Sequence, residues 1–206
     1  MAKEQRPANG AGRRAEYAEQ TKQAILEAGR TLFAEQGYFA TKVEEIARTA
    51  RVAPATVYAV GGGKSGILRT LMEAGVATED VTEILARIQT ATDPLELLTF
   101  LIRSTRMIFE TWSPLMRQVV AAAPQEPSVR DSLEIAHRSL RGGLELTARR
   151  LDGLGALRVT IPQATDILWL NLCNTAYFIR TDDLGWSLDT SEKWLNETLP
   201  PLLLNQ

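Results

Sequence analysis

The sequence has few histidine, cysteine and aromatic residues and no long apolar run, and these features exclude several classes of protein. The 206 residues include one histidine and one cysteine, and aromatic side chains make up 6% of the chain. A single cysteine forms no internal disulfide, which fits a reducing compartment, and one histidine with one cysteine does not complete a structural zinc site. No apolar run is long enough to span a bilayer, and the N-terminus lacks the apolar core of a signal peptide. We therefore expect a cytoplasmic protein with no membrane partner, no metal and no cofactor.

Catalytic constellations are also missing. Cys173 lies in an apolar segment and is expected to be buried and inert. His137 lies among arginines in a predicted helix, as a surface or interface residue does. The segment GGGKS at residues 61–65 resembles a phosphate-binding loop, but that loop needs glycine where Tyr58 stands, and no apolar strand precedes it. We predict no catalytic residue, and hence a protein that is not an enzyme.

What the chain does contain is helix-forming sequence. Hydrophobic residues make up 45% and charged residues 23%, which is an ordinary globular balance, and the frequent Ala, Leu, Glu and Arg favour helices. Apolar residues recur at helical spacing, and no strand pattern appears. The predicted helices span residues 17–36, 41–50, 54–60, 65–76, 78–91, 94–111, 113–123, 128–152, 162–179 and 189–199.

Charge is distributed unevenly along the chain. The net charge of −2 argues against a nucleic-acid partner at first sight. Residues 1–70, however, hold 11 Lys and Arg against 7 Asp and Glu, whereas residues 71–206 hold 12 against 18. A basic N-terminal part on an acidic remainder indicates that only the first part faces phosphate groups.

The segment TKVEEIARTARVAPATVYAVGGGK, residues 41–64, predicts two short helices joined by a tight turn. Thr41 can cap the first helix in a capping box with Glu44, and Pro54 suits the first position of the second. Val57 and Tyr58 are expected to pack inward. The small residues that remain outside would let the second helix lie close to the floor of a DNA major groove.

This segment resembles the helix-turn-helix of the TetR family of transcriptional regulators over roughly residues 20–70. The matching residues are Thr41, Ile46, Ala47, Val52, Thr56, Val57, Tyr58 and Lys64. The resemblance implies DNA binding through Thr41, Lys42, Arg51, Pro54, Ala55, Thr56, Tyr58 and Lys64. Of these, Thr41, Lys42 and Lys64 are expected to hold the DNA backbone, which fixes register rather than base sequence. Thr56, Tyr58 and Arg51 are further candidates for phosphate contacts.

The resemblance also implies an all-α fold in two domains. We expect a disordered arm over residues 1–16, a three-helix domain with the helix-turn-helix over 17–64, and a larger helical domain for ligand binding and dimerisation over 65–206. Two departures from the family pattern stand out. Ala53 removes a side-chain helix cap, and Val60-Gly61 replaces two aromatic residues, which predicts a looser hinge to the next helix.

The C-terminal domain is expected to form a homodimer through the helices at 128–152 and 162–179, because the second of these is apolar nearly all round. It also offers candidates for a pocket that binds a mostly apolar small molecule: Arg103, Met107, Trp112, Met116, Asn171, Asn174, Tyr177 and Phe178. Together these features favour a repressor that binds a palindromic double-stranded DNA operator and is released by such an effector. The alternative is a helical ligand-binding or scaffold protein whose DNA reading is weakened, because the second helix carries few polar side chains.

Overall fold

The computed structural model describes residues 9–205 and divides the chain into two compact units between Leu71 and Met72. We call residues 9–71 the head and residues 72–205 the body. Helix α4, Gly63–Gly75, begins in the head and ends in the body. Among the described residues, the elements are helices without strands, in agreement with the all-α prediction.

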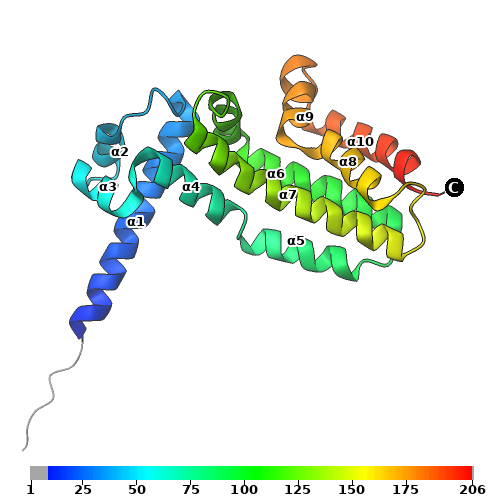
Figure 1. Ribbon diagram of the computed structural model, residues 1–206, viewed down its shortest axis with the longest axis horizontal. Coiled ribbons are helices and arrows are strands. Elements are labelled where there is room, and N and C mark those ends of the chain that lie inside the picture. Colours follow the sequence, from blue (N-terminus) through cyan, green and yellow to red (C-terminus); the bar gives the residue numbers. More distant parts are fainter. Residues whose placement is uncertain (1–8, 206) are drawn as a thin grey trace, which may run out of the picture. The chain divides into compact units, whose positions relative to one another are not determined.

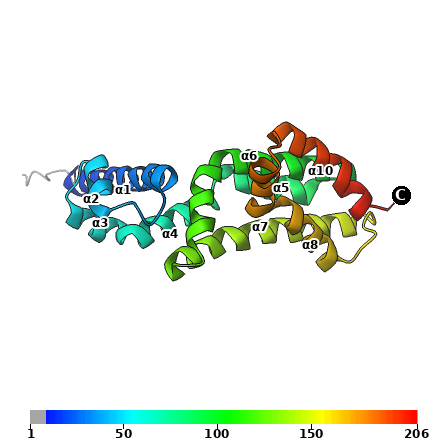
Figure 2. The same cartoon turned by 90° about the horizontal axis from the view of Figure 1, so that it is seen from above.

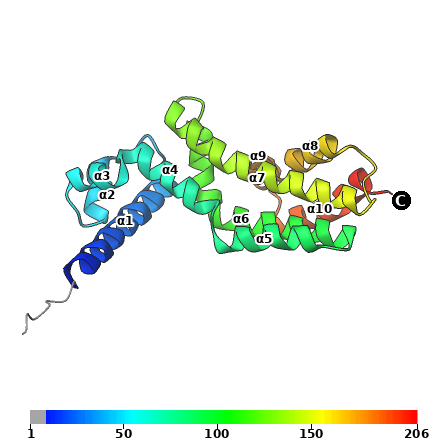
Figure 3. The same ribbon diagram turned by 60° about the horizontal axis from the view of Figure 1, so that its bottom comes forward.

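The head consists of α1 (Asn9–Gln36), α2 (Val43–Thr49), α3 (Pro54–Gly61) and the start of α4. Helices α2 and α3 pack against each other and against α1 (Figures 1 and 3). Their contact faces supply a small apolar core, whose fully buried members include Ile25, Phe33, Ile46, Val57, Ile67 and Leu68. These residues recur at helical spacing along each element, so the core follows from the sequence pattern.

Helix α1 begins earlier than the sequence predicts. It starts at Asn9 instead of residue 17, so the part of the expected arm from residue 9 to residue 16 is helical and not disordered. A stretch rich in Ala, Arg and Glu extends a helix at little cost once the following turns are fixed by packing. Residues 1–8 of the expected arm lie outside the described residues.

The body is built on two long antiparallel helices. These are α6 (Pro94–Ala122) and α7 (Pro127–Gly153), which lie side by side (Figure 1). Helix α5 (Glu79–Thr90) packs against both, α8 (Ile161–Leu172) packs on α7, and α10 (Leu188–Leu203) packs on α6 (Figure 2). The short α9 (Asn174–Phe178) and the π-helical turn η1 (Ile179–Asp183) connect α8 to α10.

Prolines interrupt fewer helices than predicted. The two helices expected at 94–111 and 113–123 are one continuous helix, α6, with Pro114 inside it. Helix α10 likewise continues through Pro200 and Pro201 instead of ending at residue 199. An interior proline costs about 3 kcal/mol, and burial of Leu115 and Met116 just beyond Pro114, and of Leu203 beyond Pro201, offsets that cost.

The apolar segment 162–179 is not the single helix that the sequence predicts. Cys173 adopts an extended backbone with ψ 159°, which ends α8 and restarts the chain as α9. The π-helical turn that follows brings the Arg180 side chain into the interior, where Nε donates to Ser191 Oγ at 2.7 Å and Nη2 donates to the Asn171 carbonyl at 2.9 Å. Cys173 is partly buried, so the expectation of full burial is wrong.

Candidate nucleic-acid interface and ligand cavity

The helix-turn-helix is capped one residue later than predicted. Lys42 is the N-cap of α2, and its N–H donates to Glu45 Oε2 at 3.1 Å, so Thr41 and Glu44 do not form the expected capping box. Thr41 is instead buried, and its hydroxyl donates to the Gly37 carbonyl at 2.8 Å. The side chain therefore ties the start of α2 to the end of α1, and the structure does not present it as a phosphate contact.

The turn between α2 and α3 depends on an unusual backbone conformation. Arg51 has a φ of 57° and follows the helix C-cap Ala50, at the position that glycine most often occupies. The N–H of Val52 donates to the Ala47 carbonyl at 2.9 Å and closes the turn. The Arg51 side chain is exposed, three residues before α3 begins at Pro54.

Helix α3 presents a small, mostly apolar surface. Pro54 occupies the first turn, and Ala53 caps the helix without a side-chain hydrogen bond, as predicted. Pro54, Ala55 and Ala59 are exposed and Thr56 is partly buried. Val57 is buried, but Tyr58 is 60% exposed, so the prediction that Tyr58 packs inward is wrong. Its phenol is therefore available at the surface.

Lys64 holds the head together. Its Nζ donates to the Tyr38 carbonyl at 2.8 Å and lies 4.6 Å from the centroid of the Tyr38 ring. The side chain is partly buried. It therefore links the start of α4 to the segment between α1 and α2, and the predicted role as a phosphate anchor competes with these contacts. Among the predicted DNA-binding residues, Lys42 and Arg51 keep exposed cationic side chains.

Gly61 and Gly66 pack at the connection between α3 and α4, where the sequence lacks the expected aromatic residues. A Cβ at Gly61 would lie 2.9 Å from Ile67 Cγ1 and 3.3 Å from Ile25 Cγ2, so Ile67 already fills the space beside it. A Cβ at Gly66 would lie 2.3 Å from the Gly61 carbonyl oxygen, which shows that α3 and α4 meet at backbone distance. The connection is therefore closely packed, and the looser hinge stays a prediction.

The body contains a cavity of about 140 Å³. Its walls come from the end of α4 and from α5, α6, α7, α8 and α9. The lining consists of Met72, Gly75, Val76, Val81, Ile84, Leu85, Ile88, Leu101, Ser104, Thr105, Ile108, Phe109, Trp112, Met116, Ala136, Ser139, Leu140, Gly143, Leu172, Asn174 and Tyr177. Most of these side chains are apolar, as is usual for small-molecule sites.

The cavity includes half of the predicted pocket residues. Trp112, Met116, Asn174 and Tyr177 line it. The others do not: Arg103 and Met107 are exposed, Asn171 Nδ2 donates to the Ile167 carbonyl, and Phe178 packs on Phe109 and under Arg117. Sequence reasoning missed the walls from α4, α5 and α7, because their apolar residues have the same helical spacing as ordinary core residues.

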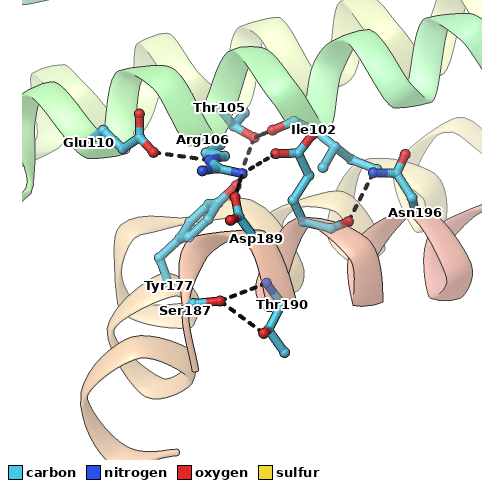
Figure 4. Close-up of polar contacts among 10 residues, drawn as sticks. Ile102, Thr105, Arg106, Glu110, Tyr177, Ser187, Asp189, Thr190 and Asn196 are labelled. Carbon is cyan, nitrogen blue, oxygen red and sulfur yellow. Dashed lines mark hydrogen bonds and ion pairs between the residues drawn. The ribbon is translucent and has the colours of Figure 1, made fainter. Parts of the chain in front are cut away.

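Tyr177 joins the cavity to a polar cluster on its far side. The Tyr177 ring stacks on Phe109 at 4.6 Å between centroids, and its hydroxyl lies 3.2 Å from Thr105 Oγ1. Burial raises the pKa of Tyr177 above its ordinary value. Next to it, Arg106 forms ion pairs with Glu110, Asp189 and Glu192, which tie α6 to the first turn of α10 (Figure 4).

Among residues 9–205, no helix has the length and apolar character of a membrane span. Over the same residues, no group of three or more His, Cys, Asp or Glu side chains is arranged to hold a metal ion.

The head is a helix-turn-helix whose second helix, α3, is largely exposed, and the body is a separate helical unit that contains a cavity. Residues 25–71 match the family model of the bacterial regulatory proteins of the tetR family, so the head is similar to the N-terminal part of these regulators. The model describes bacterial regulatory proteins, which agrees with the resemblance predicted from the sequence for this region. No curated protein matches the chain.

Solved structures share the fold over nearly the whole chain. A transcriptional regulator from Saccharomonospora viridis in complex with choline is 20% identical, with a TM-score of 0.75, over 91% of this chain and 100% of that one. NalD, the secondary repressor of the MexAB-OprM multidrug efflux pump in Pseudomonas aeruginosa, is 22% identical, with a TM-score of 0.70, over 93% and 99%. The SmeT–triclosan complex is 18% identical, with a TM-score of 0.72, over 90% and 92%.

Proposed function

We propose that this chain is a cytoplasmic transcriptional repressor that binds a palindromic operator as a homodimer and is released by a small, mostly apolar molecule. The observation that carries the proposal is α4. Its first part packs in the core of the matched head through Ile67 and Leu68, and its last residues, Met72 and Gly75, line the cavity of the body. One continuous helix therefore belongs to both functional parts.

DNA binding is assigned to α3 and its flanks. The exposed Pro54, Ala55 and Ala59 let the helix approach base edges closely, where a methyl group can contact thymine. The exposed Tyr58 hydroxyl and the Lys42 and Arg51 cations are suited to phosphate oxygens. Thr41 and Lys64 act indirectly, because their polar groups hold α2 and α4 in place.

The effector signal is assigned to the contact between α4 and α6. A Cβ at Gly75 would lie 2.7 Å from Cη2 of Trp112, so the end of α4 rests directly on this indole. A ligand that displaces Trp112 or Met72 changes the preferred position of α4, and the head moves with the helix. Release then follows if the ligand prefers the α4 position that does not fit the operator. The neighbours with bound choline and triclosan support a ligand role for a cavity in this fold.

Dimerisation is assigned to the outer faces of α7 and α8. Leu170 is 71% exposed on α8, next to Trp169, which packs against His137 of α7 at 5.1 Å between ring centroids. In the proposed dimer, a second subunit covers Leu170 together with the Trp169–His137 pair, and aromatic residues are enriched in such interfaces. Two heads are also what a palindromic operator requires.

One observation favours the alternative of a ligand-binding or scaffold protein with weak DNA reading. Between Pro54 and Gly61, the polar side chains of α3 are limited to Thr56 and Tyr58. A repressor with this helix must gain specificity from methyl contacts, from phosphate contacts or from DNA shape. Both interpretations predict a cavity, so only DNA binding separates them.

The test is selection of genomic fragments by purified protein at physiological salt, read by sequencing. A repressor enriches a palindrome with half-sites separated by whole helical turns, and its affinity falls steeply with salt. Tyr58→Phe, which removes only the hydroxyl, should weaken binding to all enriched sequences by about five-fold, and Tyr58→Ala should weaken it further. A folded dimer that enriches no sequence would favour the scaffold alternative.

A further inference from the structure

The cavity in the body has a lining without charge. None of its side chains, all of which belong to described residues, is Asp, Glu, Lys, Arg or His. Two cations lie behind the wall near Tyr177: Arg106, which is paired with three carboxylates, and Arg180, whose guanidinium lies 4.6 Å from the Tyr177 ring centroid. Neither lines the cavity. An ionised ligand would therefore lose its hydration without gaining a counter-charge, which is strongly unfavourable.

Two of the hydroxyl groups that line the cavity already donate hydrogen bonds to protein atoms. The Thr105 hydroxyl donates to the Ile102 carbonyl at 2.9 Å. Because a hydroxyl has a single proton, the 3.2 Å contact with Tyr177 must be a donation from the Tyr177 hydroxyl to Thr105 Oγ1. The hydroxyl protons of Thr105 and Tyr177 are therefore donated to protein atoms and are not available to a ligand.

Ser104 is different. It is 4% exposed, lines the cavity, and forms no hydrogen bond with any described residue, whereas the neighbouring Thr105 and the buried Ser132 both donate to carbonyls of their own helices. A hydroxyl that lines a cavity without a protein partner can donate one hydrogen bond to a molecule in that cavity and accept others from it. Ser139 and Asn174 also line the cavity, but both are only partly buried. The Ser104 hydroxyl is thus the most deeply buried donor and acceptor of the cavity wall that is not committed to a protein partner.

We infer that the effector of this protein is an uncharged molecule with an apolar ring body and one hydrogen-bonding group, such as a hydroxyl, that pairs with Ser104. Carboxylates and primary ammonium compounds, which are strongly hydrated, are excluded as effectors. This inference rests on the proposed function and deepens it, since it names the ligand class of the same cavity. The apolar body is held by Trp112, Phe109 and the aliphatic side chains of α5.

The experiment is calorimetric titration of the full-length protein with four probes that share one ring system: methylnaphthalene, naphthylmethanol, naphthoate and naphthylmethylammonium. We expect naphthylmethanol to bind best, methylnaphthalene about five-fold more weakly, and the two ions at least about fifty-fold more weakly. Tighter binding of either ion, or no binding of any probe to folded protein, would overturn the inference.

Two serine variants test whether Ser104 makes the hydrogen bond to the ligand. Ser104→Ala should lower the affinity for naphthylmethanol about five-fold and leave that for methylnaphthalene unchanged. Ser132→Ala removes an equally buried serine hydroxyl of the body that does not line the cavity, so it should change neither affinity. An equal loss for both probes in Ser104→Ala would show a general packing defect and contradict the hydrogen bond.

The ligand measurement uses no DNA, so it separates two failures. If naphthylmethanol binds as expected but operator binding does not respond to it, the ligand class stands and the regulatory link of the proposed function fails. If the protein binds and releases an operator but prefers an ionised probe, the regulator stands and the ligand class fails.

Discussion

In the head, backbone atoms of α3 and α4 pack directly against each other, whereas in the body side chains surround a cavity. In the head, α3 and α4 approach so closely that a Cβ at Gly66 would lie 2.3 Å from the Gly61 carbonyl oxygen. In the body, a Cβ at the cavity-lining Gly143 would meet only Leu85 Cδ2, at 3.6 Å. Under the proposed function, the first arrangement keeps α3 in one orientation for DNA, and the second leaves room for a ligand.

The largest expected effect comes from adding one methyl group to the head. Gly66→Ala should gain up to about 1 kcal/mol in helix propensity but lose about 3 kcal/mol or more to the clash with backbone that cannot move aside. All four tryptophans lie in the body, at positions 112, 169, 186 and 194. Unfolding of the head should therefore appear as an early transition in far-ultraviolet circular dichroism that tryptophan fluorescence does not follow.

The matched control is Gly12→Ala in α1, where an added Cβ has nothing within 4 Å. This variant should melt at or slightly above the wild-type temperature, because only helix propensity changes. Coincident dichroism and fluorescence transitions in Gly66→Ala, at the wild-type temperature, would contradict the close backbone packing of the head.

Filling the cavity should stabilise the body, whereas Gly66→Ala should destabilise the head. Gly143→Leu places an apolar side chain in open space, so we expect a stabilisation of about 1 to 2 kcal/mol from helix propensity and added apolar burial. The same variant should abolish ligand binding. Gly142→Leu gains the same propensity at an exposed neighbouring position with nothing within 4 Å, and it should bind ligand normally. Equal ligand affinity in the two variants, measured by calorimetry, would mean that the ligand binds elsewhere.

A smaller effect is expected at the turn of the helix-turn-helix. Arg51→Gly should stabilise the head by about 1 kcal/mol, because glycine adopts a φ of 57° without steric cost. If Arg51 also contacts a phosphate, the same variant should weaken binding to all DNA sequences and reduce the salt slope by about one. Stability is measured by urea unfolding followed by circular dichroism, and DNA affinity by titration at several salt concentrations.

The control is Arg48→Ala, which removes a nearby exposed charge without relieving backbone strain. It should leave the stability of the head nearly unchanged. A loss of stability in Arg51→Gly would show that the Arg51 side chain makes contacts that outweigh its conformational cost.

The head was more predictable from sequence than the body, for a physical reason. The turn, the Pro54 start of α3 and the inward Val57 depend on short-range geometry, which residue identity largely determines. The position of Tyr58 and the role of Lys64 were missed, because they depend on Gly63 and Tyr38, which pack against them only in the folded head.

In the body, the helices were predictable but not the cavity. Whether Ile84 or Ile108 touches a neighbour or an open volume depends on how α5, α6 and α7 are spaced, and the helical pattern of apolar residues is the same in both cases. The break at Cys173 was also missed, because it is compensated by contacts of Arg180 with Ser191, which is 11 residues further along the chain. Local sequence carries no signal for such compensation.

The smallest expected effect tests the outer face of the body. Burial lowers the pKa of His137 below its ordinary value of 6.5, against an opposing effect of Glu134. The unfolded chain then binds the proton more tightly than the folded one, so this residue destabilises the fold as the pH falls from about 6.5 toward the folded-state pKa. His137→Gln should flatten the dependence of stability on pH between about pH 7.5 and pH 5.5, measured by tryptophan fluorescence during urea unfolding.

The variant His137→Gln also tests whether His137 lies in the dimer interface. If α7 and α8 form the dimer interface, a second subunit buries His137 further, and the loss of stability on acidification should grow with protein concentration in the wild type. In His137→Gln this concentration dependence of the acid effect should disappear. An acid effect that is independent of concentration in the wild type would place the interface away from the His137–Trp169 pair, because a proton bound at an uncovered histidine has no influence on association.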